Sequence, residues 1–287
     1  MKRALIAQLL LLFFSITSFT YKSEKLTVQD ALLQKKIAVE LKYHYVPGDH
    51  SIEMSVTNLT SEALDMEIPV GTIFLPDDTG AQTLINAQEQ YVRIEGNRKK
   101  MFPEMGFCTQ LHHHGSDASS TFALGFTKRP KVLAIAKYLD SLGNVPLDTK
   151  QEAIWCVSDD EDVSNAYLDD TAESHSLRKK LCALTGQKDT WYNEQRQITQ
   201  DENLNFIPVP TEVKGQLSFH TDDVVEIQGC IKDSNGKILF QNSNKSTAGP
   251  GDVDFDFELS VQGWPSGTYH VVYMSGTKQL LDQAFTI

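Results

Sequence analysis

Apolar and polar residues alternate with a period of two in several segments of this chain, most clearly in residues 36–43, 51–58 and 253–260. This alternation is typical of strands that bury one face and leave the other in solvent. Turn-forming sequences such as Pro76-Asp77-Asp78 and Asp233-Ser234-Asn235-Gly236 lie between such segments. A series of short strands separated by turns predicts β-sandwiches.

The period changes to a helical one between residues 129 and 186. Pro130 suits the first turn of one helix, which runs to Leu142, a second helix begins near Thr149, and a third covers residues 172–185. We therefore predict a mainly β chain with a helical segment: an N-terminal β-sandwich plus a three-helix segment, then a C-terminal immunoglobulin-like β-sandwich.

The chain divides into four parts on composition. Residues 1–20 have the charged start, apolar middle and small-residue end of a signal peptide, which predicts a secreted or cell-surface protein. A β-rich domain follows at residues 21–190, with its helical segment at 129–186. Residues 191–210 are polar and lack a period, which predicts a linker, and residues 211–287 form the predicted immunoglobulin-like sandwich.

The charge of the chain limits its partners. The formal net charge is -12, and removal of the signal peptide, with Lys2 and Arg3, changes it to -14. An acidic surface repels phosphate backbones and anionic lipid, so we expect no nucleic-acid partner. No apolar run in the sequence is long enough for a comfortable membrane span, so we predict none.

The C-terminal module carries two short sequences with a recognisable form, IKDSNGKIL at residues 231–239 and WPSGTYHVVYMSG at residues 264–276. With these, the module resembles the immunoglobulin-like C-terminal domains of exported Bacteroidota proteins. The resemblance implies a sorting signal for secretion, and a spacer without chemistry is the alternative interpretation. The chain ends Gln283-Ala284-Phe285-Thr286-Ile287, without the basic tail usual for sorting.

A cysteine and a glutamine form the most specific chemical pattern. Phe107-Cys108 ends a predicted strand, and Gln151, followed by Ala153-Ile154-Trp155, lies 43 residues after the cysteine at a helix start. This order resembles the bacterial surface thioester domains, in which an aromatic-Cys element precedes a helix, a turn and a T-Q-x-A-[IL]-W helix. The resemblance implies an internal thioester between the Cys108 sulfur and the Gln151 side-chain carbonyl, which would react with an external amine or hydroxyl. His113 is then a possible general base.

Two other interpretations compete for the same residues. Thr149 and Glu152 fit a capping box, in which Gln151 has no chemical role. The chain has four cysteines, and an even number in an exported protein favours disulfides. A bridge from Cys108 to Cys156, or from Cys156 to Cys182, would stabilise the fold by roughly 2–4 kcal/mol.

Histidines and acids offer weaker patterns. His112 and His114 would share one face of a strand, as in a metal-dependent secreted enzyme, but the spacing supplies no third ligand. We therefore predict no metal and no cofactor. The acidic run from Asp159 to Asp162 lacks calcium-loop spacing, which predicts a solvated loop.

The sequence thus predicts a secreted or cell-surface binding or adhesion protein rather than an enzyme, with an extracellular protein or glycan as partner. Covalent capture through Cys108 and Gln151 is one alternative. A non-reactive module stabilised by disulfides is the second, and a metal-dependent enzyme that uses His112 to His114 is the third.

Overall fold

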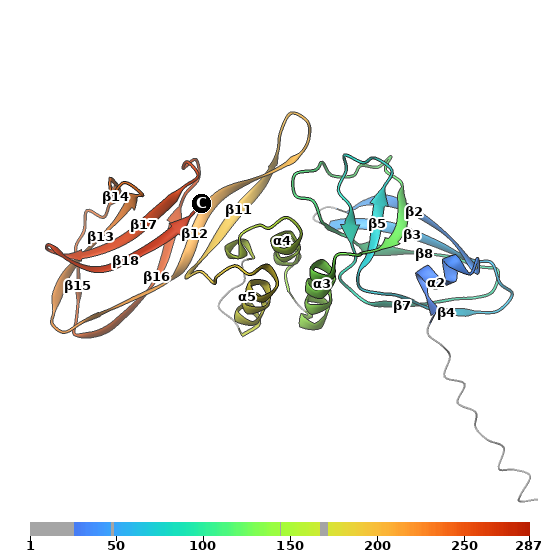
Figure 1. Cartoon of the computed structure of the whole chain (residues 1–287), viewed down its shortest axis with the longest axis horizontal. Helices are drawn as coiled ribbons and strands as arrows, with labels where there is room; N and C mark the ends of the chain where they lie inside the picture. Colours follow the sequence, from blue (N-terminus) through green and yellow to red (C-terminus); the bar gives the residue numbers. More distant parts are fainter. Residues whose placement is uncertain (1–25, 47–48, 144, 167–171) are drawn as a thin grey trace, which may run out of the picture.

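The computed structural model describes residues 26–46, 49–143, 145–166 and 172–287. The predicted signal peptide, residues 1–20, lies outside the described residues. The described part of the chain is mainly β with a helical segment, as the sequence predicts. In Figure 1 the helices lie between two β modules, the N-terminal one on the right and the C-terminal one on the left. Within the described ranges, every helix is too short or too polar for a membrane crossing.

The N-terminal module is built from three small sheets. The first has the order β2-β3-β8, with β2 (Ile37–Val46), β3 (Asp49–Asn58) and β8 (Lys99–Met105). The second has the order β1-β4-β7, with β1 (Leu26–Thr27), β4 (Leu64–Ile68) and β7 (Gln90–Ile94). The third has the order β10-β5-β6-β9, with β10 (Phe122–Phe126), β5 (Thr72–Pro76), β6 (Leu84–Ile85) and β9 (Phe107–Cys108).

The alternation in β3 is confirmed, because Ile52, Met54 and Val56 are fully buried in the core of this module. Side chains at every second position point to one face of a strand, so β3 contributes a continuous apolar row. A short helix, α2 (Val28–Leu33), also packs on this core and was not predicted. Thr27 caps it by accepting a hydrogen bond from the backbone N–H of Asp30.

The helical segment contains α3 (Pro130–Leu142), α4 (Leu147–Ser158), the 3-10 turn η1 (Val163–Asn165) and α5 (Ala172–Thr185). The predicted bounds of the first and third helices are confirmed. The three helices and η1 bury their apolar faces in a second core, which the buried side chains of β6 and β9 also enter. β9 therefore lies where the N-terminal sheets meet the helices.

The predicted capping box at Thr149 is wrong. α4 begins at Leu147, and Pro146 is its N-cap without a side-chain hydrogen bond. Thr149 is buried within the first turn, and the Glu152 carboxylate pairs with Arg196 instead. Pro146 lacks an N–H and is therefore tolerated at this end, and its carbonyl oxygen accepts from the Lys150 N–H at 3.0 Å. The N-cap thus lies three residues before Thr149, and Gln151 lies in the second turn.

The C-terminal module is a sandwich of two facing sheets that share one core. One sheet has the order β11-β12-β16, with β11 (Tyr192–Gln200), β12 (Phe206–Thr221) and β16 (Gly251–Ser260). The other has the order β14-β13-β17-β18, with β14 (Ile238–Gln241), β13 (Val225–Asp233), β17 (Thr268–Ser275) and β18 (Lys278–Thr286), and β15 (Ser246–Ala248) pairs with β13. Aromatic side chains meet between the sheets, as where the ring of Phe255 on β16 lies 4.7 Å from the ring of Tyr273 on β17, centroid to centroid.

Residues 191–210 are not a linker, contrary to the sequence prediction. They form β11 and the start of β12, a long antiparallel hairpin. The outer half of this hairpin has only two strands, because β12 pairs with β16 only from Glu212 onward. A two-stranded arm has little apolar surface to bury, so its sequence lacks the alternation that marks a half-buried strand.

Candidate functional site

Helix α4 places the Gln151 side chain against the backbone of Cys108. The Cys108 N–H donates to Gln151 Oε1 at 2.8 Å, and Gln151 Nε2 donates to the Cys108 carbonyl oxygen at 2.9 Å. Cys108 pairs with Leu84 of β6 on its other side, so the Gln151 amide occupies the place that a further strand would take. The structure therefore brings together the two residues that the sequence singled out, 43 positions apart.

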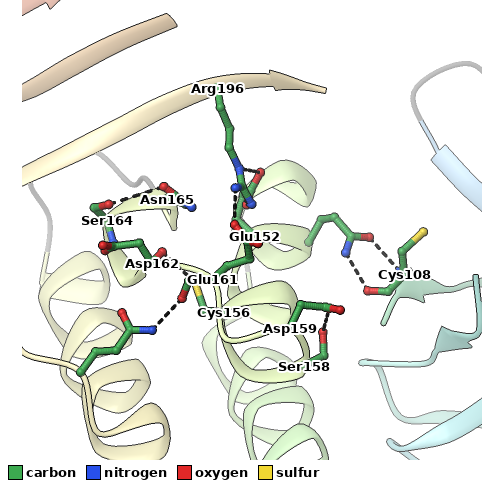
Figure 2. Close-up of polar contacts among 12 residues, drawn as sticks. Cys108, Glu152, Cys156, Ser158, Asp159, Glu161, Asp162, Ser164, Asn165 and Arg196 are labelled. Atoms are coloured by element: carbon green, nitrogen blue, oxygen red, sulfur yellow. Dashed lines mark hydrogen bonds and ion pairs between the residues drawn. The ribbon is translucent and has the colours of Figure 1, made fainter. Parts of the chain in front are cut away.

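The Cys108 thiol is buried and free. Burial raises the pKa of Cys108 to about 12, and the nearby charge of Asp159 acts in the same direction. The thiol is therefore protonated at neutral pH, and a thiolate is the stronger nucleophile. Figure 2 shows the Cys108 sulfur pointing away from the two dashed bonds made by its backbone.

The predicted disulfides are absent. All four cysteines lie in the described part of the chain, and each is free. Cys108 belongs to the core of the N-terminal sheets, whereas Cys156 belongs to the core of the helices. The Cys156 thiol donates to the Asp162 carbonyl oxygen at 3.2 Å, and Cys182 packs at the edge of the same helical core. Each of these sulfurs is thus accommodated by packing rather than by a bridge.

Gln151 also lines a cleft with a volume of about 1360 Å³. The cleft lies between the helical segment and the β11–β12 hairpin, and its lining is a mixture of amides, carboxylates, hydroxyls and a few apolar side chains. The carboxylates of the lining belong to Asp148, Glu152, Glu173 and Glu194, and strand β11 also contributes Arg196, Ile198, Thr199 and Gln200. A partner in this cleft would therefore meet the Gln151 side chain.

A buried ion cluster holds one side of the cleft together. Arg196 of β11 pairs with Glu152 of α4 and with Glu161, both at 2.5 Å, and its side chain is only 4% exposed. Burial alone would lower the pKa of Arg196, but the hydrogen bonds and charges of the two glutamates raise it, so the guanidinium stays charged. Figure 2 shows Arg196 reaching from its strand to the helix. The acidic run is thus not wholly a solvated loop, since Glu161 is a structural ion partner.

Two further groups on the cleft have unusual environments. Burial raises the pKa of Glu194 to about 7, although the charge of Arg196 opposes the rise. The indole of Trp155 is 4% exposed, and its Nε1–H is buried without a hydrogen-bond partner among the described residues. The Arg196 guanidinium lies over the same ring, 5.9 Å from its centroid.

Glu104 of β8 is a buried carboxyl away from the cleft. Its Oε2 accepts a hydrogen bond from Gln90 at 3.1 Å, while Oε1 is buried and unpartnered in the described structure. Burial raises the pKa of Glu104 to about 8, so the group is largely neutral at pH 7.

The histidines are held by loop contacts. His114 Nε2 lies 3.2 Å from Asp78 Oδ2, and its Nδ1 lies 2.9 Å from the Gly115 carbonyl oxygen. His113 Nδ1 is buried without a partner in the described part of the chain, and the described hydrogen bonds do not join His113 to Cys108 or Gln151. Among the described residues, no three His, Cys, Asp or Glu side chains lie close enough together to hold a metal ion. His112 therefore has no set of metal ligands around it in the described part of the chain.

Comparison with known proteins adds little. No family model and no curated protein matches this chain. Among solved structures, the chain is similar to a transglutaminase from red sea bream, with 9% identity and a TM-score of 0.22 over 88% of this chain and 31% of that chain. It is also similar to a β-glucosidase from Kluyveromyces marxianus, with 9% identity and a TM-score of 0.21 over 86% of this chain and 45% of that chain. The chain spans less than half of either protein, and likeness at these TM-scores carries no argument about function.

Proposed function

We propose that this protein is a secreted or cell-surface binding protein that captures its partner covalently through a thioester between Cys108 and Gln151. The pair of hydrogen bonds between the Gln151 amide and the Cys108 backbone carries the proposal. They hold the reacting carbonyl beside the cysteine, and intramolecular reactions gain most of their rate from such fixed geometry.

The chemistry balances without a co-reactant. The Cys108 sulfur adds to Cδ of Gln151, the C–N bond breaks, and the thiol proton leaves with the nitrogen as ammonia. A partner amine then attacks the same carbon, the C–S bond breaks, and the sulfur recovers a proton. Because burial raises the pKa of Cys108 to about 12, proton transfer to the leaving nitrogen belongs to the same step as sulfur attack.

The oxygen of the reacting carbonyl already has a donor. As sulfur adds, negative charge develops on Gln151 Oε1, and the Cys108 N–H that donates to it stabilises that charge. The start of α4 lies one turn earlier, at Leu147, so this role belongs to the strand N–H rather than to the helix N-terminus. A rotation of the Cys108 side chain toward the amide completes the approach.

Intact-protein mass spectrometry tests the proposal. We expect the native protein to be lighter than its sequence by one ammonia, and methylamine to add to it. Cys108→Ala and Gln151→Ala should have the full sequence mass, while Cys156→Ala, which changes another buried cysteine, should keep the mass loss. A native protein of full sequence mass that does not react with methylamine would refute the proposal.

The second candidate is a module that binds an extracellular protein or glycan without covalent capture. It is favoured by the cleft itself, because Gln151 can dock α4 on β9 without reacting and still leave about 1360 Å³ open to a partner. Partner binding that persists in Cys108→Ala and is reversed by dilution would favour it. In either case the C-terminal sandwich, as an immunoglobulin-like domain, serves as spacer or sorting signal.

A further inference from the structure

The outer half of the β11–β12 hairpin has two edges of different kinds. On β12, Pro208 pairs with Ile198 and Pro210 pairs with Arg196. Proline has no N–H, so these are the pairs in which the strands exchange no hydrogen bonds. Both prolines therefore turn toward the outer edge of β12, where they protect it from strand addition.

The same register fixes the direction of the β11 backbone. If Pro208 and Pro210 face outward, the N–H and C=O groups of Arg196, Ile198 and Gln200 face outward from β11. A hydrogen bond near the loop supports this direction, because the Asp201 N–H donates across the hairpin to the Asn205 carbonyl oxygen. Every second residue of β11 faces β12, so Asp201 facing inward places Gln200, Ile198 and Arg196 outward. In the described structure, no hydrogen bond is made by these outward backbone groups.

This open edge borders the cleft. The cleft is lined by consecutive residues of β11, among them Ile198, Thr199 and Gln200. Since consecutive side chains point to opposite faces of a strand, the cleft reaches the edge of β11 as well as one face. Its volume of about 1360 Å³ exceeds the range of roughly 300–1,000 Å³ usual for small ligands. The site thus has the space and the free main-chain groups that an extended polypeptide requires.

The charge of the lining indicates the kind of polypeptide. Asp148, Glu152, Glu173 and Glu194 line the cleft, with Arg196 as the counter-charge among the lining residues. Arg196 is already paired with Glu152 and Glu161, so the carboxylates of Asp148 and Glu173 leave negative charge in excess on the cleft. Basic side chains would complement it.

We propose that β11 accepts an extended basic peptide segment of a partner protein as an added strand, paired along Arg196, Ile198 and Gln200. The added strand lies in the same cleft as the Gln151 side chain. The inference stands on the hairpin and not on the thioester, but if the proposed capture is right it identifies the partner as a polypeptide rather than a glycan.

The test uses a short peptide of alternating lysine and threonine with the full chain, and the matching glutamate–threonine peptide as its charge control. Hydrogen exchange is followed at the amides of Arg196, Ile198 and Gln200, and affinity is measured by calorimetry. We expect the lysine peptide to protect these amides and the glutamate peptide to leave them unprotected. Failure of the lysine peptide to protect them overturns the proposal.

Substitutions on the edge supply the second arm. Ile198→Pro removes an outward N–H without removing a bond to β12, and we expect roughly tenfold weaker binding, whereas Ile198→Val should bind as the native chain does. Gln200→Pro, at an exposed position, makes the same test if Ile198→Pro disturbs packing. Unchanged affinity in a folded proline variant overturns the proposal.

Two outcomes separate this inference from its rivals. Protection that appears without peptide and grows with protein concentration assigns the edge to a second copy of this chain and overturns the peptide. Peptide binding by Cys108→Ala, together with a native protein of full sequence mass, would keep the strand-addition site and remove the thioester.

Discussion

Helix α4 contacts the two β modules through adjacent residues, one with a neutral side chain and one with a charged side chain. Gln151 meets the N-terminal module through a neutral amide bonded to the Cys108 backbone. Glu152 meets the C-terminal module through a buried ion pair with Arg196. Successive residues on a helix point roughly 100° apart, so one turn of α4 serves both modules. The neutral contact contains no titratable group, whereas the charged contact depends on pH because Glu152 must be ionised to pair with Arg196.

Arg196→Met should break the charged contact and give the largest effect. Removal of the guanidinium leaves Glu152 and Glu161 buried without their partner, and loss of one member of a buried pair costs about 3–5 kcal/mol of unfolding free energy. Denaturant unfolding measures it. In the triple variant that adds Glu152→Gln and Glu161→Gln, most of the loss should be recovered. A single variant as stable as the native chain would contradict this account.

Gln151→Ala should break the neutral contact at a smaller cost. It leaves the Cys108 N–H and C=O without partners, which costs about 1–3 kcal/mol. In Gln151→Glu the side chain can accept from the N–H but, when ionised, cannot donate to the carbonyl, so it should not restore stability. Thermal unfolding of both variants, in high and low salt, checks that the alanine loss is independent of salt.

Glu104→Gln sharpens the contrast between the modules, because this buried carboxyl is paired with an amide rather than a cation. Burial raises the pKa of Glu104 from 4.5 to about 8. Between these values the unfolded chain binds fewer protons, so the Glu104 contribution to stability falls as pH rises from 4.5 to 8 and is constant above. Melting temperatures should lose this decline in Glu104→Gln, while exposed Glu62→Gln should keep it.

Glu194→Gln should show the same effect in a narrower window. Burial raises the pKa of Glu194 from 4.5 to about 7, against the charge of Arg196 and with the charges of Asp162, Glu152 and Glu161. Its contribution to stability is therefore present at low pH and is lost as pH rises from 4.5 to 7. The melting temperature of Glu194→Gln should decline less over this window than that of the native chain. A control variant, Glu202→Gln in the hairpin loop, should behave as the native chain does.

The sequence predicted regular elements better than the contacts between them. The rows in β3 and the bounds of α3 and α5 follow from side-chain period and end signals, which are local. The hairpin at residues 191–210 was missed, because a two-stranded arm buries too little to impose a period. Arg196 was missed for the same reason, since a single arginine in a polar stretch gives no sign that two glutamates will enclose it.

The site divides in the same way. The proximity of Cys108 and Gln151 was anticipated from a motif, but the form of the contact, amide to backbone, depends on where α4 begins. The capping pattern placed the N-cap at Thr149, whereas the structure has it at Pro146. The disulfides were expected from a count of cysteines, and a count does not say that Cys108 and Cys156 belong to separate cores or that Cys156 and Cys182 stay free within one core.

The two prolines of β12 also limit stoichiometry. A sheet that adds strands at both edges can polymerise, since each added strand presents a new unpaired edge. Here Pro208 and Pro210 close one border of the arm, and β11 leaves the other open. Recruitment along the arm therefore terminates on the β12 side, and an assembly built on this arm grows in one direction.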